Sequence, residues 1–265
     1  MTRTSMGIKA INLPKLALEA FNRTTADPKR VQQIDTLGAR IDMLIDFVYG
    51  YTDIDDPSLD TGDEIINWTF VDVADDLNAA NWNVSCGFYK TGASCLRNAL
   101  DIATVALYFQ IRENTNGMAG GYNRFFTEWD RGDRDTPNWG EMTSIIKRET
   151  AIQSFNNRYS CNIIDEAYDH FKYLCNFTHS RPFDRTSGRP TNSIWLGSDT
   201  PDFDAATFER LMSLAEETIA WIATLWLTTF PGILSTDPLN DSITYAKYEQ
   251  LLSHSRGREA LIFAR

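Results

Sequence analysis

Apolar residues recur at steps of three and four along most of the chain, and this period constrains the fold more than any other feature. In residues 28–49, for example, Val31, Ile34, Leu37 and Ile41 lie on one stripe. This spacing is typical of amphipathic helices, whereas half-buried strands need strict alternation of apolar and polar residues. No credible alternating run occurs. The sequence therefore predicts an all-α protein, a helical bundle.

Breaks in this period give the expected helices. They cover residues 28–49, 63–80, 82–112, 162–178 and 204–230, with a shorter helix through Met142, Ile145 and Ile146 and a final amphipathic segment at 242–253. Asp27, Asp204 and a residue in the turn at 135–138 are expected to cap helices. The helices at 82–112 and 204–230 are apolar on most sides, which predicts that they lie at the centre of the bundle.

Composition and charge narrow the class of protein. The chain has 265 residues, of which 43% are hydrophobic, and a net charge of −11. These values exclude a largely disordered chain and argue against a protein that coats nucleic acid non-specifically. The four cysteines form no C-x-x-C pair, and neither a signal-peptide core nor a membrane-spanning run is found. We expect a cytoplasmic protein with no membrane partner.

His179 is the candidate catalytic residue. It closes the helix at 162–178, and Lys172 precedes it by two helical turns on the same face, with Asn176 between them. A histidine beside Lys172 and Arg181 has the character of a general acid or base near a phosphodiester. In the alternative interpretation His179 bonds a backbone carbonyl and caps its helix.

Two other histidine patterns receive structural interpretations. His170 follows Asp169 directly and Glu166 by four residues, which favours a surface ion pair. Cys175 and His179 are four residues apart, the correct step for two metal ligands, but a closed zinc site needs two more and no second Cys/His pair is found. We therefore predict no metal and no cofactor.

Arg97 and Asp101 lie four residues apart in a helix expected to be central, and so on one side of it. In the structural interpretation they form a buried ion pair that determines helix packing. In the functional interpretation they bind substrate in the same cavity as His179. The sequence does not decide between the two.

The segment from Arg181 to Asp204 has no periodicity and carries arginines at intervals of four, namely Arg181, Arg185 and Arg189. Because prolines and a glycine prevent a helix here, the three guanidinium groups can surround a single anion. Alternatively, this is an ordinary surface loop whose arginines meet neighbouring aspartates.

Two helical segments carry a family resemblance. The first reads Gly-Phe-Tyr-Lys at 87–90 and Cys-Leu-Arg-Asn-Ala-Leu-Asp at 95–101, and the second contains Tyr173 and Leu174 and ends in Thr178 and His179. This combination resembles the all-helical HEPN-like superfamily over residues 63–182. Many members are metal-independent RNA endonucleases of toxin–antitoxin and phage-defence systems, and they are typically dimers with the site at the dimer interface. Others are inactive binding or sensing modules.

The resemblance implies how the chain is divided, and the sequence also departs from the family pattern at one position. Residues 1–265 would form a single helical domain, with an N-terminal extension at 1–26, the HEPN-like core at 63–182 and additional packed helices at 204–254. In active members four to six residues separate an arginine from the catalytic histidine that follows it. Here no arginine stands at that distance from His179, and Lys172 lies at the outer limit of the window.

Two functions follow. In the first, the protein is a HEPN-like RNA endonuclease or effector that acts on RNA as a homodimer, with His179 as acid or base, Lys172 and Arg181 holding phosphate and Asn176 orienting the substrate. In the second, it is a non-catalytic helical module that binds or senses a protein partner. The acidic surface and the missing motif arginine favour the second function, and the cations around His179 favour the first.

Overall fold

The computed structural model describes residues 12–52, 63–116, 124–178, 200–231, 248–252 and 255–264. Every secondary-structure element in these ranges is a helix, and none is a strand. The all-α prediction is confirmed.

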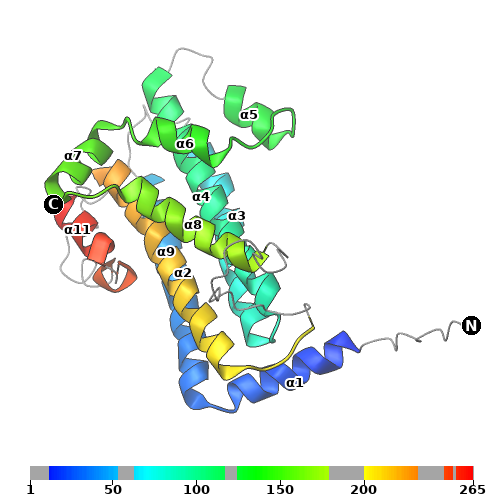
Figure 1. The fold of residues 1–265 in the computed structure, drawn as a ribbon. Coiled ribbons are helices and arrows are strands. Elements are labelled where there is room, and N and C mark those ends of the chain that lie inside the picture. Colours follow the sequence, from blue (N-terminus) through cyan, green and yellow to red (C-terminus); the bar gives the residue numbers. More distant parts are fainter. Residues whose placement is uncertain are drawn as a thin grey trace, which may run out of the picture.

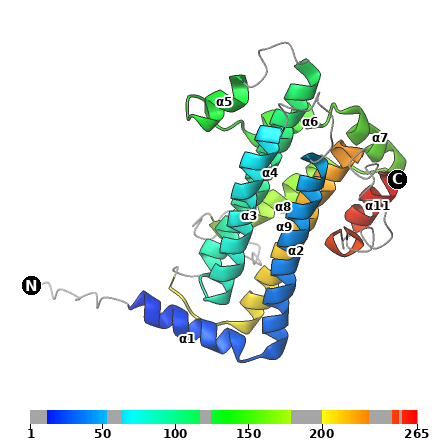
Figure 2. The ribbon, with the colours of Figure 1, turned by 180° about the vertical axis from the view of Figure 1, so that it is seen from behind.

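Four long helices form the bundle: α2 (Pro28–Thr52), α3 (Asp63–Ser85), α4 (Tyr89–Asn116) and α9 (Ala205–Thr229). α9 contacts each of the other three, so it is central, as predicted for 204–230. A fifth helix, α8 (Ile163–Thr178), lies against α4 and α9. Figures 1 and 2 view the bundle from opposite sides, with α8 and α9 in front in Figure 1 and α2 and α3 in front in Figure 2.

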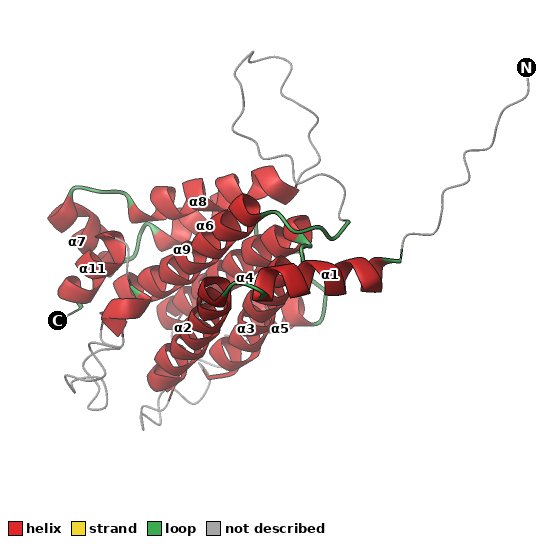
Figure 3. Ribbon diagram, turned by 90° about the horizontal axis from the view of Figure 1, so that it is seen from below, coloured by secondary structure: helices red, strands yellow, loops and turns green. Residues whose placement is uncertain are grey.

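Shorter helices cover the ends of this bundle (Figure 3). At one end α1 (Leu13–Thr25) packs across α2 and α3. At the other end α6 (Trp139–Ile146) lies on α4 and α8, while α7 (Thr150–Tyr159) and α11 (Ser255–Phe263) pack on α9. α5 (Arg124–Asp130) precedes α6 in the chain, and residues 248–251, within the final segment expected to be amphipathic, are also helical.

The helix predicted at 82–112 is wrong in its first turn. Residues 82–85 continue α3, and the chain turns at Gly87, whose φ is +79°. The Phe88 amide donates to the Asn83 carbonyl at 2.8 Å and the Gly87 amide to the Val84 carbonyl at 3.1 Å, which is a Schellman motif. The turn is tight and apolar residues continue on both sides of it, so the period of the sequence did not reveal it.

The predicted helix caps are confirmed. The Asp27 carboxylate accepts from the Lys29 amide at 3.0 Å, and Asn138 Oδ1 accepts from the Glu141 amide at 3.0 Å. Asp204 Oδ1 accepts from the Thr207 amide at 2.7 Å, and this hydrogen bonding lowers the pKa of Asp204. Each cap satisfies a backbone donor that the first helical turn leaves without a partner.

α9 passes through the core with its buried threonine hydroxyls bonded to carbonyls of the same helix. Every residue from Thr218 to Thr229 is buried. The hydroxyls of Thr218, Thr224 and Thr228 donate to carbonyls four residues earlier, at 2.6–2.8 Å, so burying them leaves no donor unpaired. No helix in the described parts of the chain combines the length and apolar character needed to cross a bilayer.

Candidate functional site

Half of the residues predicted to form a site lie where the structure describes them. His179, Arg181, Arg185 and Arg189 fall outside the described residues, so their predicted roles remain predictions. Lys172 and Asn176 lie on α8, and Arg97 and Asp101 lie on α4.

Lys172 and Asn176 lie on the exposed face of α8. The Lys172 Nζ is 2.5 Å from Asp169 Oδ1 and 4.8 Å from the centre of the Tyr168 ring. The hydrogen bond to Asp169 raises the pKa of Lys172. The ammonium therefore already has a carboxylate and an aromatic ring as partners, which reduces the positive charge it can offer to a phosphate.

Arg97 and Asp101 connect α4 to two neighbouring helices. Asp101 Oδ1 accepts from the Trp139 indole at 2.6 Å, and Oδ2 lies 3.9 Å from the Arg97 guanidinium. The guanidinium also lies 5.2 Å from the centre of the Phe171 ring, which stacks on Trp139 at 4.3 Å. Both charged side chains are partly exposed rather than fully buried. Burial raises the pKa of Asp101. The pair thus links α4 to α6 and α8 without being buried, and the substrate-binding role remains a prediction.

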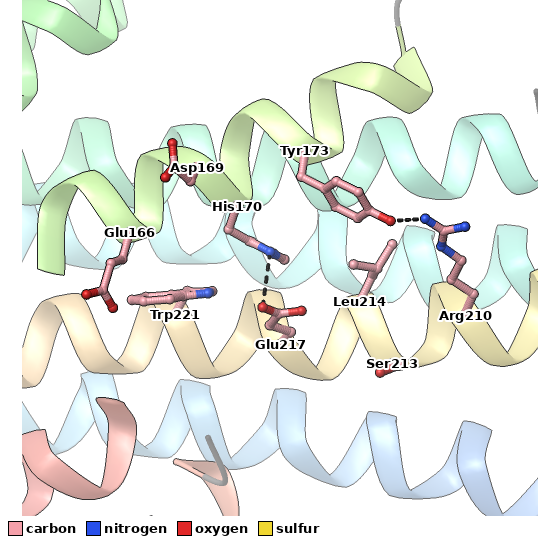
Figure 4. A pocket seen from close by; sticks show the side chains of 9 residues that line it. All are labelled: Glu166, Asp169, His170, Tyr173, Arg210, Ser213, Leu214, Glu217 and Trp221. Carbon is pink, nitrogen blue, oxygen red and sulfur yellow. Dashed lines mark hydrogen bonds and ion pairs between the residues drawn. The ribbon is translucent and has the colours of Figure 1, made fainter. Parts of the chain in front are cut away.

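The candidate site that the structure adds is a groove of about 590 Å³ between α8 and α9. Figure 4 shows its side chains, which come from one face of each helix. The lining residues are Glu166, Asp169, His170 and Tyr173 from α8, and Arg210, Ser213, Leu214, Glu217 and Trp221 from α9.

His170 lies in the wall of this groove, so the prediction of a surface ion pair with its sequence neighbours is wrong. Its side chain is only 4% exposed. Position 170 shares a helical face with positions 166, 173 and 177, and that face packs on α9. The imidazole reaches Thr218 Oγ1 from Nε2 at 2.9 Å and Glu217 Oε1 from Nδ1 at 3.5 Å.

The hydrogen bonds around Thr218 determine which imidazole nitrogen donates. The Thr218 hydroxyl donates to the Leu214 carbonyl at 2.7 Å, so its oxygen accepts from His170 Nε2–H. Nδ1 lies 3.5 Å from Glu217 Oε1. Both ring nitrogens are therefore engaged within the protein, and His170 is a structural link between α8 and α9.

Arg210 occupies the other end of the groove. Its Nη2 donates to the Tyr173 hydroxyl (Figure 4). Its guanidinium carbon lies 5.6 Å from the centre of the Tyr173 ring and 5.5 Å from that of Phe177. Within the described residues no carboxylate lies within ion-pair distance of it. The two rings orient the guanidinium and leave further N–H donors available to a ligand.

The groove acid Glu166 is bound by Arg256 of α11. The guanidinium contacts both oxygens of Glu166, at 2.7 and 2.8 Å, and Glu259 at 2.7 Å. These hydrogen bonds raise the pKa of Arg256 above its usual value. The bidentate pair joins α11 to α8 and compensates the charge of Glu166.

Metal ligands do not gather in the described part of the chain. No group of three or more His, Cys, Asp or Glu side chains there has the arrangement of a metal site. Cys175 lies on α8, and His179, four residues later, is outside the described residues.

Comparison with known proteins identifies no relative: no family model, no curated protein and no solved structure matches this chain.

The bond between His170 and Thr218 gives a first testable prediction. Thr218→Val should lower the free energy of unfolding by about 1–3 kcal/mol, because it leaves the buried imidazole N–H without an acceptor. Thr224→Val is the matched control. Thr224 is equally buried in α9, but among the described residues its hydroxyl bonds only the Ala220 carbonyl of its own helix. Its loss should cost on the order of 0.5 kcal/mol. Urea unfolding followed by circular dichroism measures both, and equal losses would contradict the role given to Thr218.

Proposed function

We propose that the protein is a non-catalytic helical binding module and that the groove between α8 and α9 receives an anionic group of its ligand. The observation that carries this proposal is Arg210, whose guanidinium is held on Tyr173 and Phe177 without a carboxylate partner among the described residues. An oriented guanidinium beside an open groove is suited to binding a carboxylate or a phosphate.

The state of the other polar groups supports binding rather than catalysis. His170 is buried and both of its ring nitrogens have protein partners, so it is not free to transfer a proton to a substrate. Glu166 is paired with Arg256 and Asp169 with Lys172. The groove therefore offers a positioned cation but no unengaged acid–base pair.

RNA cleavage is the second candidate function, in line with the HEPN-like resemblance. The observation that favours it is that Lys172 and Asn176 share the exposed face of α8, whose last residue directly precedes His179. This function would include the homodimer, the antitoxin partner and the defence role expected from the family.

One pair of experiments separates the two functions. Purified protein is incubated with total RNA, with and without chelator, and compared with His179→Ala. We expect no cleavage that depends on His179. Cleavage by the wild type that is lost in His179→Ala would overturn the binding-module proposal in favour of the nuclease.

The anion site is tested separately by titrating the protein with acetate and with inorganic phosphate while recording NMR shifts. Arg210→Gln should weaken binding of the preferred anion by about tenfold or more, since charge-assisted hydrogen bonds contribute about 1.5–3 kcal/mol. Arg131→Gln is the control, because Arg131 is exposed and lies outside the groove. Equal binding by wild type and Arg210→Gln would contradict the proposal.

A further inference from the structure

The groove carries opposite charges at two points along α9. Arg210 provides a guanidinium at one end, beside the hydroxyl of Tyr173. Glu217 provides a carboxylate toward the other end, and its side chain is 48% exposed although Oε1 faces His170. The carboxylate can therefore accept a hydrogen bond from a second group in the groove.

The spacing along α9 indicates how far apart a ligand's charges must be. Arg210 and Glu217 are seven residues, or two turns, apart, which is about 10.5 Å along the helix axis. Leu214 lies between them on the same face of α9, as Figure 4 shows. A ligand that contacts both charged residues must place an apolar chain over Leu214.

The acids Glu166 and Asp169 of the groove each have a cationic partner within the protein. The Arg256 guanidinium donates two hydrogen bonds to the Glu166 carboxylate, and Asp169 lies 2.5 Å from the Lys172 ammonium. The Glu217 carboxylate faces the His170 ring at 3.5 Å, and among the groove carboxylates it alone has no lysine or arginine within ion-pair distance in the described residues. It is the carboxylate most able to bind a cation from outside.

From this arrangement we infer that the groove binds a small dipolar ligand: a molecule with a carboxylate at one end, a protonated amine at the other and an aliphatic chain between them. The carboxylate bonds Arg210, the chain lies on Leu214 and the amine bonds Glu217. This inference rests on the proposed function, because it uses the same anion site, and it adds the ligand class.

Calorimetric titration with three matched probes tests it. L-Lysine has both charged ends, L-norleucine keeps the carboxylate and the chain but lacks the terminal amine, and cadaverine keeps the amine and the chain but lacks the carboxylate. The wild type should bind L-lysine about tenfold more tightly than either of the others. The titrations are repeated with Glu217→Gln and Arg210→Gln.

Each variant should remove one preference. Glu217→Gln should bind L-lysine and L-norleucine equally, and Arg210→Gln should bind L-lysine and cadaverine equally. Glu216→Gln is the control: this neighbouring carboxylate lies outside the groove, 3.2 Å from Arg40, and the variant should keep both preferences.

The outcomes separate this inference from the proposed function. If the wild type does not distinguish L-lysine from L-norleucine, or if Glu217→Gln keeps the distinction, the dipolar ligand is overturned. The anion site still stands in that case, provided that Arg210→Gln weakens L-norleucine binding. If no probe binds, or if Arg210→Gln binds all three like the wild type, both the inference and the anion site fail.

Discussion

Trp226→Ala is expected to lower the free energy of unfolding by about 3–5 kcal/mol, the usual cost of truncating a large buried aromatic side chain. Trp226 is 1% exposed in the last turn of α9. Its ring contacts Phe70 of α3 edge-on at 5.1 Å and Phe230 at 5.5 Å. Alanine would leave a cavity where α9 meets α3, and the packed helices on either side can close it only in part.

Trp226→Phe separates the role of the ring from that of the indole N–H. Trp226 Nε1 is buried and has no hydrogen-bond partner among the described residues. Phenylalanine removes this unsatisfied donor, which partly offsets the lost volume, so the expected loss is about 1 kcal/mol or less. Chemical unfolding followed by circular dichroism measures both variants. Equal destabilisation by Ala and Phe would show that the indole N–H, and not the packing of the ring, matters at this position.

Gly87→Ala is expected to lower the free energy of unfolding by about 3 kcal/mol or more, because two separate effects add. Its φ of +79° is unfavourable for any residue with a side chain. In addition, a Cβ at this position would lie 2.4 Å from the Asp202 carbonyl oxygen and 2.8 Å from the Asp202 amide nitrogen. Backbone atoms cannot move aside as a flexible side chain can, so the segment before α9 would have to shift.

That shift would disturb the start of α9. Tyr89, two residues after Gly87, donates its hydroxyl proton to the Asp204 carbonyl at 3.0 Å and accepts from the Asp204 amide at 2.9 Å. Asp204 in turn caps α9 through the Thr207 amide. The turn between α3 and α4 therefore helps to position the helix cap.

Gly132→Ala is the control for Gly87→Ala. Gly132 has a similar φ of +75°, but a Cβ there meets nothing within 4 Å. Gly132→Ala should lower the free energy of unfolding only by the conformational cost of a positive φ, about 1–2 kcal/mol. The difference between the two variants measures the collision with Asp202. If both lose the same stability, the close approach of Gly87 to Asp202 contributes nothing.

The sequence determined the parts of this fold that depend on neighbouring residues. A stripe with a period of 3.6 residues predicts a helix wherever it occurs, and a capping side chain bonds a backbone amide only two or three residues away, as Asp27, Asn138 and Asp204 do. The helical class and the bounds of α2, α8 and α9 could therefore be predicted to within two or three residues, whereas α1, α5, α7 and α11 were not predicted. The turn at Gly87 was missed because it is only about three residues long and apolar residues continue on both sides of it.

The groove was decided only by the tertiary structure. His170 and Thr218 bond each other across 48 residues of sequence, and Arg210 meets Tyr173 across 37. A helical-face count places His170 with Tyr173 and Phe177, but it does not say which helix covers that face. That choice depends on how five helices fill one core, a collective property of packing. Local pattern thus determined which residues share a face, and the packing of α8 on α9 decided which faces meet and which charges they bring together.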